Sequence, residues 1–190
     1  MIKACLWDMD GTIIDSMPGL TDLAVKVICK YYPVSKEAAL KSYLNTVGIP
    51  FLDQLHKIFG YDKYNYMATD EYYDLKVDIT LEAPLIASTT KLLAEAKDLI
   101  TGLVSSSDGN LVEDVVIKHG LEHSFRWWSG VGEYLTKEAQ VKAFISFYEL
   151  NPKEVNYYGD TDEDERIAKE VGMNFSKVEN GSFFELPTVL

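Results

Sequence analysis

The sequence predicts an α/β protein with a Rossmann-like, doubly wound parallel sheet of about five strands and an inserted all-helical domain. Three observations predict this fold. A compact apolar run opens the chain, short apolar runs alternate with helical periods after residue 84, and residues 15–84 show no strand pattern. Strands that alternate with helices form parallel sheets, because each crossover helix packs back onto the sheet. A chain of 190 residues has room for one such domain and an insertion.

The apolar run at residues 2–7 predicts the first strand, and its lack of polar alternation indicates burial on both faces. Apolar residues at helical spacing then predict four helices, expected at 20–31, 35–44, 51–59 and 65–79. Pro33 and Gly60 are placed to end the first and third of these helices. We therefore expect residues 15–84 to form a helical cap domain.

Helices and strands alternate from residue 84 onward. Helices are expected at 89–97, 110–119, 137–150 and 163–171, and strands at 99–104, 125–128, 155–158 and 174–178. Residues 181–190 read as a trailing loop. If the first three strands are neighbours and the fourth lies on the other side of the first, the sheet order is 5-4-1-2-3. The α/β core then comprises residues 1–14 and 85–190.

The helical insert is rich in tyrosine. Eight of the twelve tyrosines lie in it, at positions 31, 32, 43, 61, 64, 66, 72 and 73. Aromatic residues of this kind either pack the core of a small bundle or offer contacts to a substrate.

Composition and charge exclude several classes of protein. The formal net charge of −12 argues against nucleic acid or an anionic membrane as a partner. No apolar run approaches the roughly 18 residues of a membrane span, and Asp8 and Asp10 interrupt the N-terminal run too early for a signal peptide. Cys5 and Cys29 form neither a disulfide framework nor a zinc spacing. We expect a cytoplasmic protein, and these features predict no particular oligomeric state.

Four polar motifs follow predicted strands, and in a parallel sheet they share the carboxyl edge, where ligands of open α/β sheets bind. The first is Asp8-Met9-Asp10-Gly11-Thr12. Asp8 leaves the first strand as a candidate nucleophile or metal ligand, and Asp10 can hold a proton for a leaving group. Two carboxylates this close repel unless a cation lies between them or one is protonated. The competing interpretation is an ordinary polar strand exit.

The second and third motifs could bind phosphate. Ser105, followed by Ser106, is the expected first residue outside the strand 99–104, where its hydroxyl and the next N–H groups can cradle an anion. Lys137 begins a predicted helix near the sheet edge, whereas Lys142 lies further along that helix and away from the edge. Lys137 is therefore the candidate that neutralises the charges of a phosphate and of Asp8. A serine-rich turn and a solvated lysine are the competing interpretations.

The fourth motif is Gly159-Asp160-Thr161 followed by Asp164. If a helix begins near Thr161, Asp160 and Asp164 can both turn toward one cation. A small set of hard oxygen ligands suggests Mg²⁺ that retains several waters. Acidic residues that compensate a helix N-terminus are the competing interpretation, which explains the Gly159-Asp160 pair at a strand end poorly.

These residues resemble the haloacid dehalogenase superfamily, and in particular its phosphatase-like members with a small helical cap after the first motif. Residues 8–12 are similar to the opening signature of that family, and Gly159-Asp160-Thr161 with Asp164 is similar to the closing one. The resemblance covers residues 1–14 and 85–190. Glu138, which follows Lys137, departs from the proline of many capped members, and the insert matches no cap motif.

The resemblance implies a Mg²⁺-dependent phosphatase that acts on a small phosphorylated metabolite. It implies that Asp8 attacks phosphorus to form an aspartyl-phosphate, while Asp10 protonates the leaving alcohol and then takes a proton from water. The implied phosphate-binding residues are Ser105 or Ser106 with Lys137. The implied metal ligands are Asp8, Asp10 through its backbone carbonyl, Asp160 and, directly or by supporting another ligand, Asp164.

Other functions remain compatible with parts of the pattern. A C–halogen hydrolase of the same superfamily does not need Asp10, whereas a phosphomutase of the β-phosphoglucomutase type keeps both aspartates. A receiver-like signalling domain also combines aspartates, a hydroxyl and a lysine, but it has no inserted bundle. A non-catalytic phosphate-binding protein would bind Mg²⁺ without releasing phosphate.

Overall fold

A computed structural model of the chain describes residues 1–178. The chain divides into two compact units, one formed by Met1–Asp15 with the chain from Pro84 onward, and the other by Ser16–Ala83. The segment 181–190, expected to be a trailing loop, lies outside the described residues. Within residues 1–178, no helix has the length and apolar character that a membrane crossing requires.

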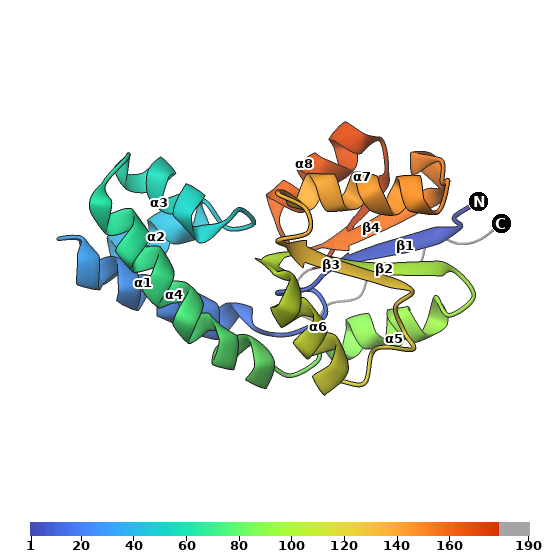
Figure 1. Cartoon of the computed structure of the whole chain (residues 1–190), viewed down its shortest axis with the longest axis horizontal. Coiled ribbons are helices and arrows are strands. Elements are labelled where there is room, and N and C mark those ends of the chain that lie inside the picture. The colour runs from blue at the N-terminus through green and yellow to red at the C-terminus, as the bar shows by residue number, and fades with distance from the viewer. Residues whose placement is uncertain (179–190) are drawn as a thin grey trace. The chain divides into compact units, whose positions relative to one another are not determined.

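The first unit, which we call the core unit, contains a parallel sheet of five strands in the order β3-β2-β1-β4-β5 (Figure 1). The strands are β1 (Ala4–Asp8), β2 (Ile100–Asp108), β3 (Trp127–Val131), β4 (Val155–Gly159) and β5 (Asn174–Lys177). This is the predicted order read from the opposite edge, so the doubly wound α/β fold is confirmed. The strand order reverses between β1 and β4.

Helices cover both faces of this sheet, with α7 and α8 on one face and α5 and α6 on the other (Figure 1). Their bounds are α5 (Ala87–Glu95), α6 (Gly109–Lys118), α7 (Lys137–Phe147) and α8 (Asp162–Val171), and the short 3-10 helix η1 (Pro152–Glu154) leads into β4. All five residues of β1 are buried as a result. Burial on both faces explains why its sequence shows no polar alternation.

The buried face of α7 links apolar packing to the polar edge of the sheet. Phe144 is fully buried, and its ring centroid lies 5.6 Å from that of Trp127. The same face continues toward the start of the helix through Val141, Gln140 and Lys137. These positions follow helical spacing, so the packing of Phe144 fixes the direction in which Lys137 points.

β2 is longer than the sequence suggests. We expected it at 99–104, but it continues to Asp108, with an irregular pairing to β3 beyond Val104. Ser105 therefore lies inside the strand rather than just beyond it. The next helix, α6, begins only at Gly109.

β3 begins at Trp127, later than the predicted start at Phe125. The N–H groups of Ser124 and Phe125 both donate to the carbonyl of Leu121 in a turn. Backbone groups that are used in this turn are not available to the strand ladder. α7 likewise ends at Phe147 instead of residue 150.

The second unit consists of four helices, α1 (Met17–Tyr31), α2 (Lys36–Leu44), α3 (Phe51–Phe59) and α4 (Lys63–Glu82). α1 packs against α2 and α4, and α3 packs against α4. Aromatic stacking runs through its core, with ring centroids 3.8 Å apart for Tyr32 and Phe59 and 4.0 Å apart for Phe51 and Tyr72. Flat rings supply much of the buried area that a bundle of this size needs.

The tyrosines of this unit range from buried to exposed, with Tyr31 and Tyr73 partly buried against the core. Tyr32, Tyr43 and Tyr72 are buried, so the packing interpretation applies to them. Tyr61 and Tyr66 are exposed and do not contribute to the core. Aromatic content alone did not separate the buried tyrosines from the exposed ones.

We predict that Phe144→Ala destabilises the protein by about 3–5 kcal/mol, because deleting a fully buried ring leaves a cavity beside Trp127. The matched control is Phe147→Ala on the same helix, whose side chain is 71% exposed. It should change the free energy of unfolding by less than about 0.5 kcal/mol. Chemical denaturation measures both, and equal destabilisation would contradict this orientation of α7.

Candidate active site

Three neighbouring strands bring the predicted residues to one edge of the sheet. Asp8 is the last residue of β1 and pairs with Val104 of β2. Ser105 therefore lies one position beyond Asp8 in the register of the sheet. On the other side of β1, β4 ends at Gly159, directly before Asp160. This edge lies where the strand order reverses, the usual ligand-binding position of an open α/β sheet.

A tight turn follows β1 and carries Asp10. The N–H groups of residues 12–14 all donate to the carbonyl of Met9. Gly11 has a φ of 79°, the left-handed conformation that glycine adopts at little cost. The hydroxyl of Ser107 donates to Oδ2 of Asp10 at 3.0 Å. The turn and this hydrogen bond together hold the Asp10 carboxylate in a defined direction.

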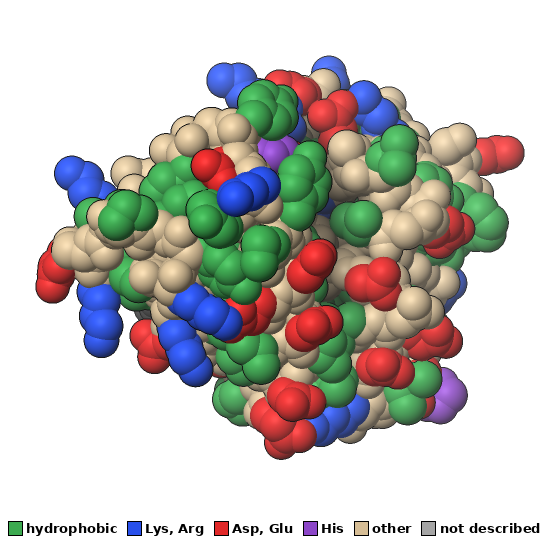
Figure 2. Space-filling model, turned by 60° about the vertical axis from the view of Figure 1, so that its left-hand side comes forward, with side chains coloured by type: hydrophobic (Ala, Val, Ile, Leu, Met, Phe, Trp, Pro, Cys, Tyr) green, Lys and Arg blue, Asp and Glu red, His purple; other side chains and the backbone are tan. Residues whose placement is uncertain are grey.

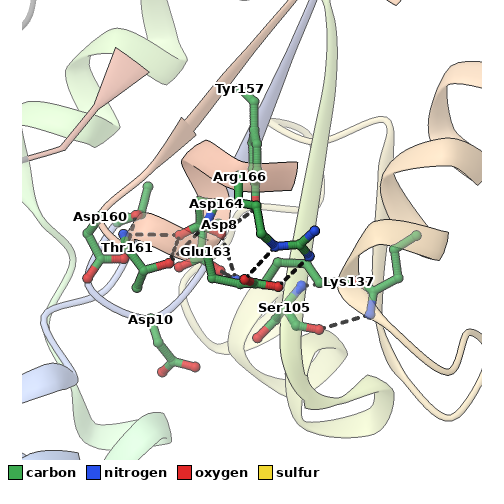
Figure 3. Close-up of polar contacts among 12 residues, drawn as sticks. Asp8, Asp10, Ser105, Lys137, Tyr157, Asp160, Thr161, Glu163, Asp164 and Arg166 are labelled. Atoms are coloured by element: carbon green, nitrogen blue, oxygen red, sulfur yellow. Dashed lines mark hydrogen bonds and ion pairs between the residues drawn. The ribbon is translucent and has the colours of Figure 1, made fainter. Parts of the chain in front are cut away.

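Lys137 is the buried cation at this edge (Figure 3). Thr136 caps α7, so that the helix begins at Lys137. Its Nζ donates to Oδ1 of Asp8 at 2.7 Å and to Oδ1 of Asp164 at 2.9 Å. Lys142 is exposed and pairs with a neighbour on its own helix. The structure thus places Lys137, and not Lys142, beside Asp8.

Both carboxylate oxygens of Asp164 accept hydrogen bonds. Oδ1 accepts from Lys137 and, at 2.7 Å, from the hydroxyl of Tyr157. Oδ2 accepts from the N–H of Thr161 at 3.1 Å and from its hydroxyl. Gly159 makes room for this carboxylate, since a Cβ at Gly159 would lie 2.5–2.7 Å from the side-chain atoms of Asp164. Asp164 is therefore held between the start of α8 and Lys137.

Asp8, Asp160 and Asp164 each offer one carboxylate oxygen, and these atoms lie within 4.8 Å of one another. Oxygen donors of this kind fit a hard cation such as Mg²⁺. Because both oxygens of Asp164 already accept hydrogen bonds, Asp8 and Asp160 fit direct ligation better. The carboxylate of Asp10 is not one of these three, although its backbone leaves the same strand end.

Burial and neighbouring charges shift the pKa values of this cluster, upward for Asp8, Asp160 and Lys137 and downward for Asp164. Burial raises the pKa of Asp8 well above its usual value, although Lys137 opposes this. Burial and the charge of Asp164 raise the pKa of Asp160 to about 6. Burial acts on Asp164 too, but Lys137 and the surrounding hydrogen-bond donors outweigh it and lower that pKa. Burial opposes the charge of Lys137, yet the carboxylates outweigh it and raise the lysine pKa.

One cation among three carboxylates leaves an excess of negative charge at the sheet edge. The protein as a whole is also acidic, with a formal net charge of −12, and Figure 2 shows acidic side chains spread over one of its faces. A divalent cation would neutralise the carboxylates and favour their ionised forms. An anionic ligand depends on such local positive charge, because the general field of the protein repels it.

The serine run lies inside β2, so the chain does not enter a helix here as we expected. Ser105 and Ser107 are buried, whereas Ser106 is half-buried. The N–H of Ser107 donates to Oγ of Ser105 at 3.0 Å, and the N–H of Ser105 donates to the side chain of Gln140 at 3.2 Å. Those two amides are used within the protein, so the hydroxyls are the more suitable groups for an anion.

Three polar residues of the site were missed in the sequence. Gln140 is completely buried against Ser105, Tyr157 donates to Asp164, and Ser107 donates to Asp10. Gln140 could have been found from its spacing, since a residue three positions after Lys137 lies on the same helix face. For Tyr157 the sequence carries no comparable signal, whereas Ser107 belongs to the run Ser105-Ser106-Ser107 that we expected to bind an anion.

Comparison with known proteins identifies relatives over nearly the whole chain. A model of the family described as haloacid dehalogenase-like hydrolase matches residues 5–178. The phosphoglycolate phosphatase of Vibrio cholerae serotype O1 is 25% identical over 186 aligned residues, which cover 90% of this chain and 81% of that protein.

Solved structures share the fold. A haloacid dehalogenase-like family hydrolase from Streptococcus pneumoniae matches with a TM-score of 0.74 and 20% identity, over 92% of this chain and 83% of that chain. CbbY from Rhodobacter sphaeroides, solved in complex with phosphate, matches with a TM-score of 0.74 and 16% identity, over 99% of this chain and 92% of that chain.

We predict that Mg²⁺ stabilises the protein against thermal unfolding more strongly at about pH 7.5 than at about pH 5. Below its pKa of about 6, Asp160 holds a proton that the cation must displace. From this one proton, the apparent affinity should fall about tenfold for each pH unit below 6.

Thermal unfolding with and without Mg²⁺ measures this effect. Asp160→Asn should remove the stabilisation, whereas Asp162→Asn, which alters an exposed carboxylate close by, should preserve it. An equal Mg²⁺ effect at both pH values, or one that persists in Asp160→Asn, would contradict the metal site.

We also predict that Gly159→Ala displaces Asp164, because the added Cβ would lie 2.5 Å from the Cβ of that residue. The expected cost is about 1–3 kcal/mol of stability, as for other overpacked sites. Gly109→Ala is the control, since its Cβ would approach no atom closer than 3.7 Å. Denaturation curves compare the two, and a neutral Gly159→Ala would contradict the close packing around Asp164.

Proposed function

The chain belongs to the haloacid dehalogenase-like hydrolases, and we propose that it is a Mg²⁺-dependent phosphatase that hydrolyses a small phosphorylated metabolite through an aspartyl-phosphate. The observation that carries this proposal is the position of Asp8. It ends the central strand, its carboxylate is fixed by Lys137 at 2.7 Å, and two further carboxylates lie beside it. We assign catalysis to residues 1–14 and 85–190, and selection of the leaving group to the helical residues 15–84.

Asp8 is the proposed nucleophile. One of its carboxylate oxygens forms a bond to phosphorus while the bond between phosphorus and the leaving oxygen breaks. Asp10 gives its proton to that leaving oxygen. The hydrogen bond from Ser107 holds Oδ2 of Asp10, which supports a fixed direction for this transfer. The products of the first step are the free alcohol and Asp8 carrying the phosphoryl group as an acyl phosphate.

Water completes the reaction. Asp10, now a carboxylate, takes a proton from the water as its oxygen attacks phosphorus. The bond between phosphorus and Asp8 breaks, inorganic phosphate leaves, and Asp8 returns to its carboxylate form. Both steps depend mainly on positioning and on neutralising the phosphoryl oxygens.

Lys137 and the serine hydroxyls are the proposed phosphoryl-binding groups. Lys137 is buried and remains charged, because the two carboxylates beside it raise its pKa. Ser105 and Ser106 follow the position that pairs with Asp8, so their hydroxyls start from the same sheet edge. Together they offer positive charge and hydrogen-bond donors in a protein with an acidic surface.

Asp8, Asp160 and the backbone carbonyl of Asp10 would hold Mg²⁺. Asp164 would instead fix Lys137 by accepting its hydrogen bond. Bound there, the cation would neutralise charge on the transferring phosphoryl group and lower the repulsion between the group and Asp8. Burial raises the pKa values of Asp8 and Asp160, and nearby carboxylates add to the effect, so a cation bound beside them would favour their ionised forms.

The relatives support a small phosphorylated substrate. The Vibrio cholerae relative is a phosphoglycolate phosphatase, and CbbY has been solved with phosphate and, as a variant, with xylulose-(1,5)bisphosphate. A panel of phosphorylated acids, sugars and nucleotides, assayed for phosphate release with and without Mg²⁺, tests the proposal. Transfer of phosphate between substrates without release would favour a phosphomutase instead.

We predict that Asp8→Asn lowers Mg²⁺-dependent phosphate release by at least about 10³-fold, because the amide is a poor nucleophile. The substitution is nearly isosteric, so circular dichroism should show a folded protein. Full activity in a folded Asp8→Asn protein would remove Asp8 from the mechanism.

Asp10→Asn is expected to lower turnover by about 10²–10⁴-fold, the usual contribution of a general acid and base. Ser107→Ala keeps the acid and removes only its hydrogen-bond donor, so a loss of about tenfold is expected. Steady-state assays on the best substrate of the panel compare them. If Asp10→Asn turned over as fast as the wild type, proton transfer would have to come from another group.

A further inference from the structure

Gln140 is the most completely buried polar side chain of α7. It is 0% exposed, and it lies on the face of the helix that also carries Lys137 and Phe144. A buried amide has two donors and two acceptor positions that need partners. One donor and one acceptor of Gln140 pair with a single residue, Ser105, which belongs to a different element of the fold.

The two hydrogen bonds form a closed pair. The N–H of Ser105 donates to Oε1 of Gln140 at 3.2 Å, and Nε2 of Gln140 donates to the carbonyl of Ser105 at 2.9 Å. A neighbouring strand would pair with backbone groups in the same way. The side chain of Gln140 thus substitutes for a strand at this position.

β2 lacks regular strand partners at Ser105. On one side, the register with β1 ends where Val104 pairs with Asp8. On the other side, the register with β3 is irregular between Val104 and Asp108. Buried peptide groups need hydrogen-bond partners, and Gln140 supplies one for the N–H and one for the carbonyl of Ser105. Gln140 therefore fixes the backbone at the residue where the regular register of β2 with β1 and β3 stops.

The hydroxyl of Ser105 is oriented as a consequence. Its Oγ accepts the N–H of Ser107 at 3.0 Å, so one lone pair is occupied. The hydroxyl hydrogen points away from that bond and can be donated to an oxygen of a ligand. Gln140 fixes the backbone of Ser105, and the N–H of Ser107 fixes its Oγ, so the side chain of Ser105 has little rotational freedom.

We propose that Gln140 is a positioning residue for phosphoryl binding, which acts by holding the backbone of Ser105 so that its hydroxyl donates to the phosphoryl group. The inference rests on the proposed function, in which Ser105 binds that group. Lys137 and Gln140 lie three positions apart on one helix face. The same helix, α7, therefore provides the positive charge of Lys137 and, through Gln140, positions the hydroxyl of Ser105.

Binding of inorganic phosphate in the presence of Mg²⁺, measured by isothermal titration calorimetry, tests this inference without requiring turnover. Gln140→Met keeps the length of the side chain and removes both hydrogen bonds. We expect phosphate affinity to fall about tenfold, which corresponds to about 1.4 kcal/mol. Ser105→Ala should weaken binding by a similar factor.

A double-mutant cycle distinguishes positioning from a general structural effect. If Gln140 acts through Ser105, adding Gln140→Met to Ser105→Ala should cause little further loss of phosphate affinity. Losses that multiply would overturn the inference. If Gln140→Met does not fold, Gln140→Asn replaces it in the cycle. Its side chain is one methylene shorter, so its amide cannot pair with both the N–H and the carbonyl of Ser105.

Gln54→Met is the matched control. Gln54 is also buried, and its Nε2 donates to the carbonyl of Ile49 at 2.9 Å, but it lies in the helical unit. Its replacement should lower thermal stability without changing phosphate affinity. A loss of affinity as large as that in Gln140→Met would overturn the inference, because it would reflect destabilisation alone.

The proposed function and this inference fail in different ways. If the wild type releases no phosphate from the panel but binds phosphate through Gln140 and Ser105, the phosphatase proposal falls and the positioning role stands. If the wild type is an active phosphatase and Gln140→Met binds phosphate normally, only the positioning role falls. A wild-type protein that binds no phosphate would overturn the positioning role as well.

Discussion

The site depends on one buried cation. Lys137 donates to Asp8 and Asp164 at 2.7 and 2.9 Å, and all three side chains are almost excluded from solvent. Charges without partners in such a place are strongly unfavourable, and removing one member of a buried pair typically costs about 3–5 kcal/mol. The buried lysine fixes two carboxylates on different elements of the fold, Asp8 at the end of β1 and Asp164 in α8. It does not neutralise the whole cluster. Burial and the neighbouring carboxylates raise the pKa values of Asp8 and Asp160 despite Lys137, so these two groups suit a divalent cation.

The surrounding fold places these charges. β1 is buried on both faces and ends at Asp8, while β4 ends at Gly159, whose lack of a side chain admits Asp164. Phe144 anchors α7 from the apolar side, so that the start of the helix reaches the sheet edge. Apolar packing thus supplies the rigidity that buried charges need, and hydrogen bonds complete it locally.

The sequence predicted much of this because strong local signals agreed with the overall fold. The unbroken apolar run before Asp8 and the Gly159-Asp160 pair indicated strand ends, and Thr136 marked a helix start beside Lys137. It did not predict the extension of β2 past Ser105, because serine carries little strand preference and the irregular pairing with β3 is a tertiary effect. Gln140 was missed for the same reason. Its spacing to Lys137 indicates a shared helix face, but its hydrogen-bond partner, Ser105, lies in a different element and is visible only in the structure.

Covalent attachment of phosphate to Asp8 is the central claim of this account. Acid quenching of the enzyme during turnover, followed by peptide mass mapping, measures it most directly. We expect one phosphoryl group on the peptide that contains Asp8, and it should form and decay as fast as the enzyme turns over. Turnover without any phosphoryl group on Asp8, or with the group on another residue, would contradict the account.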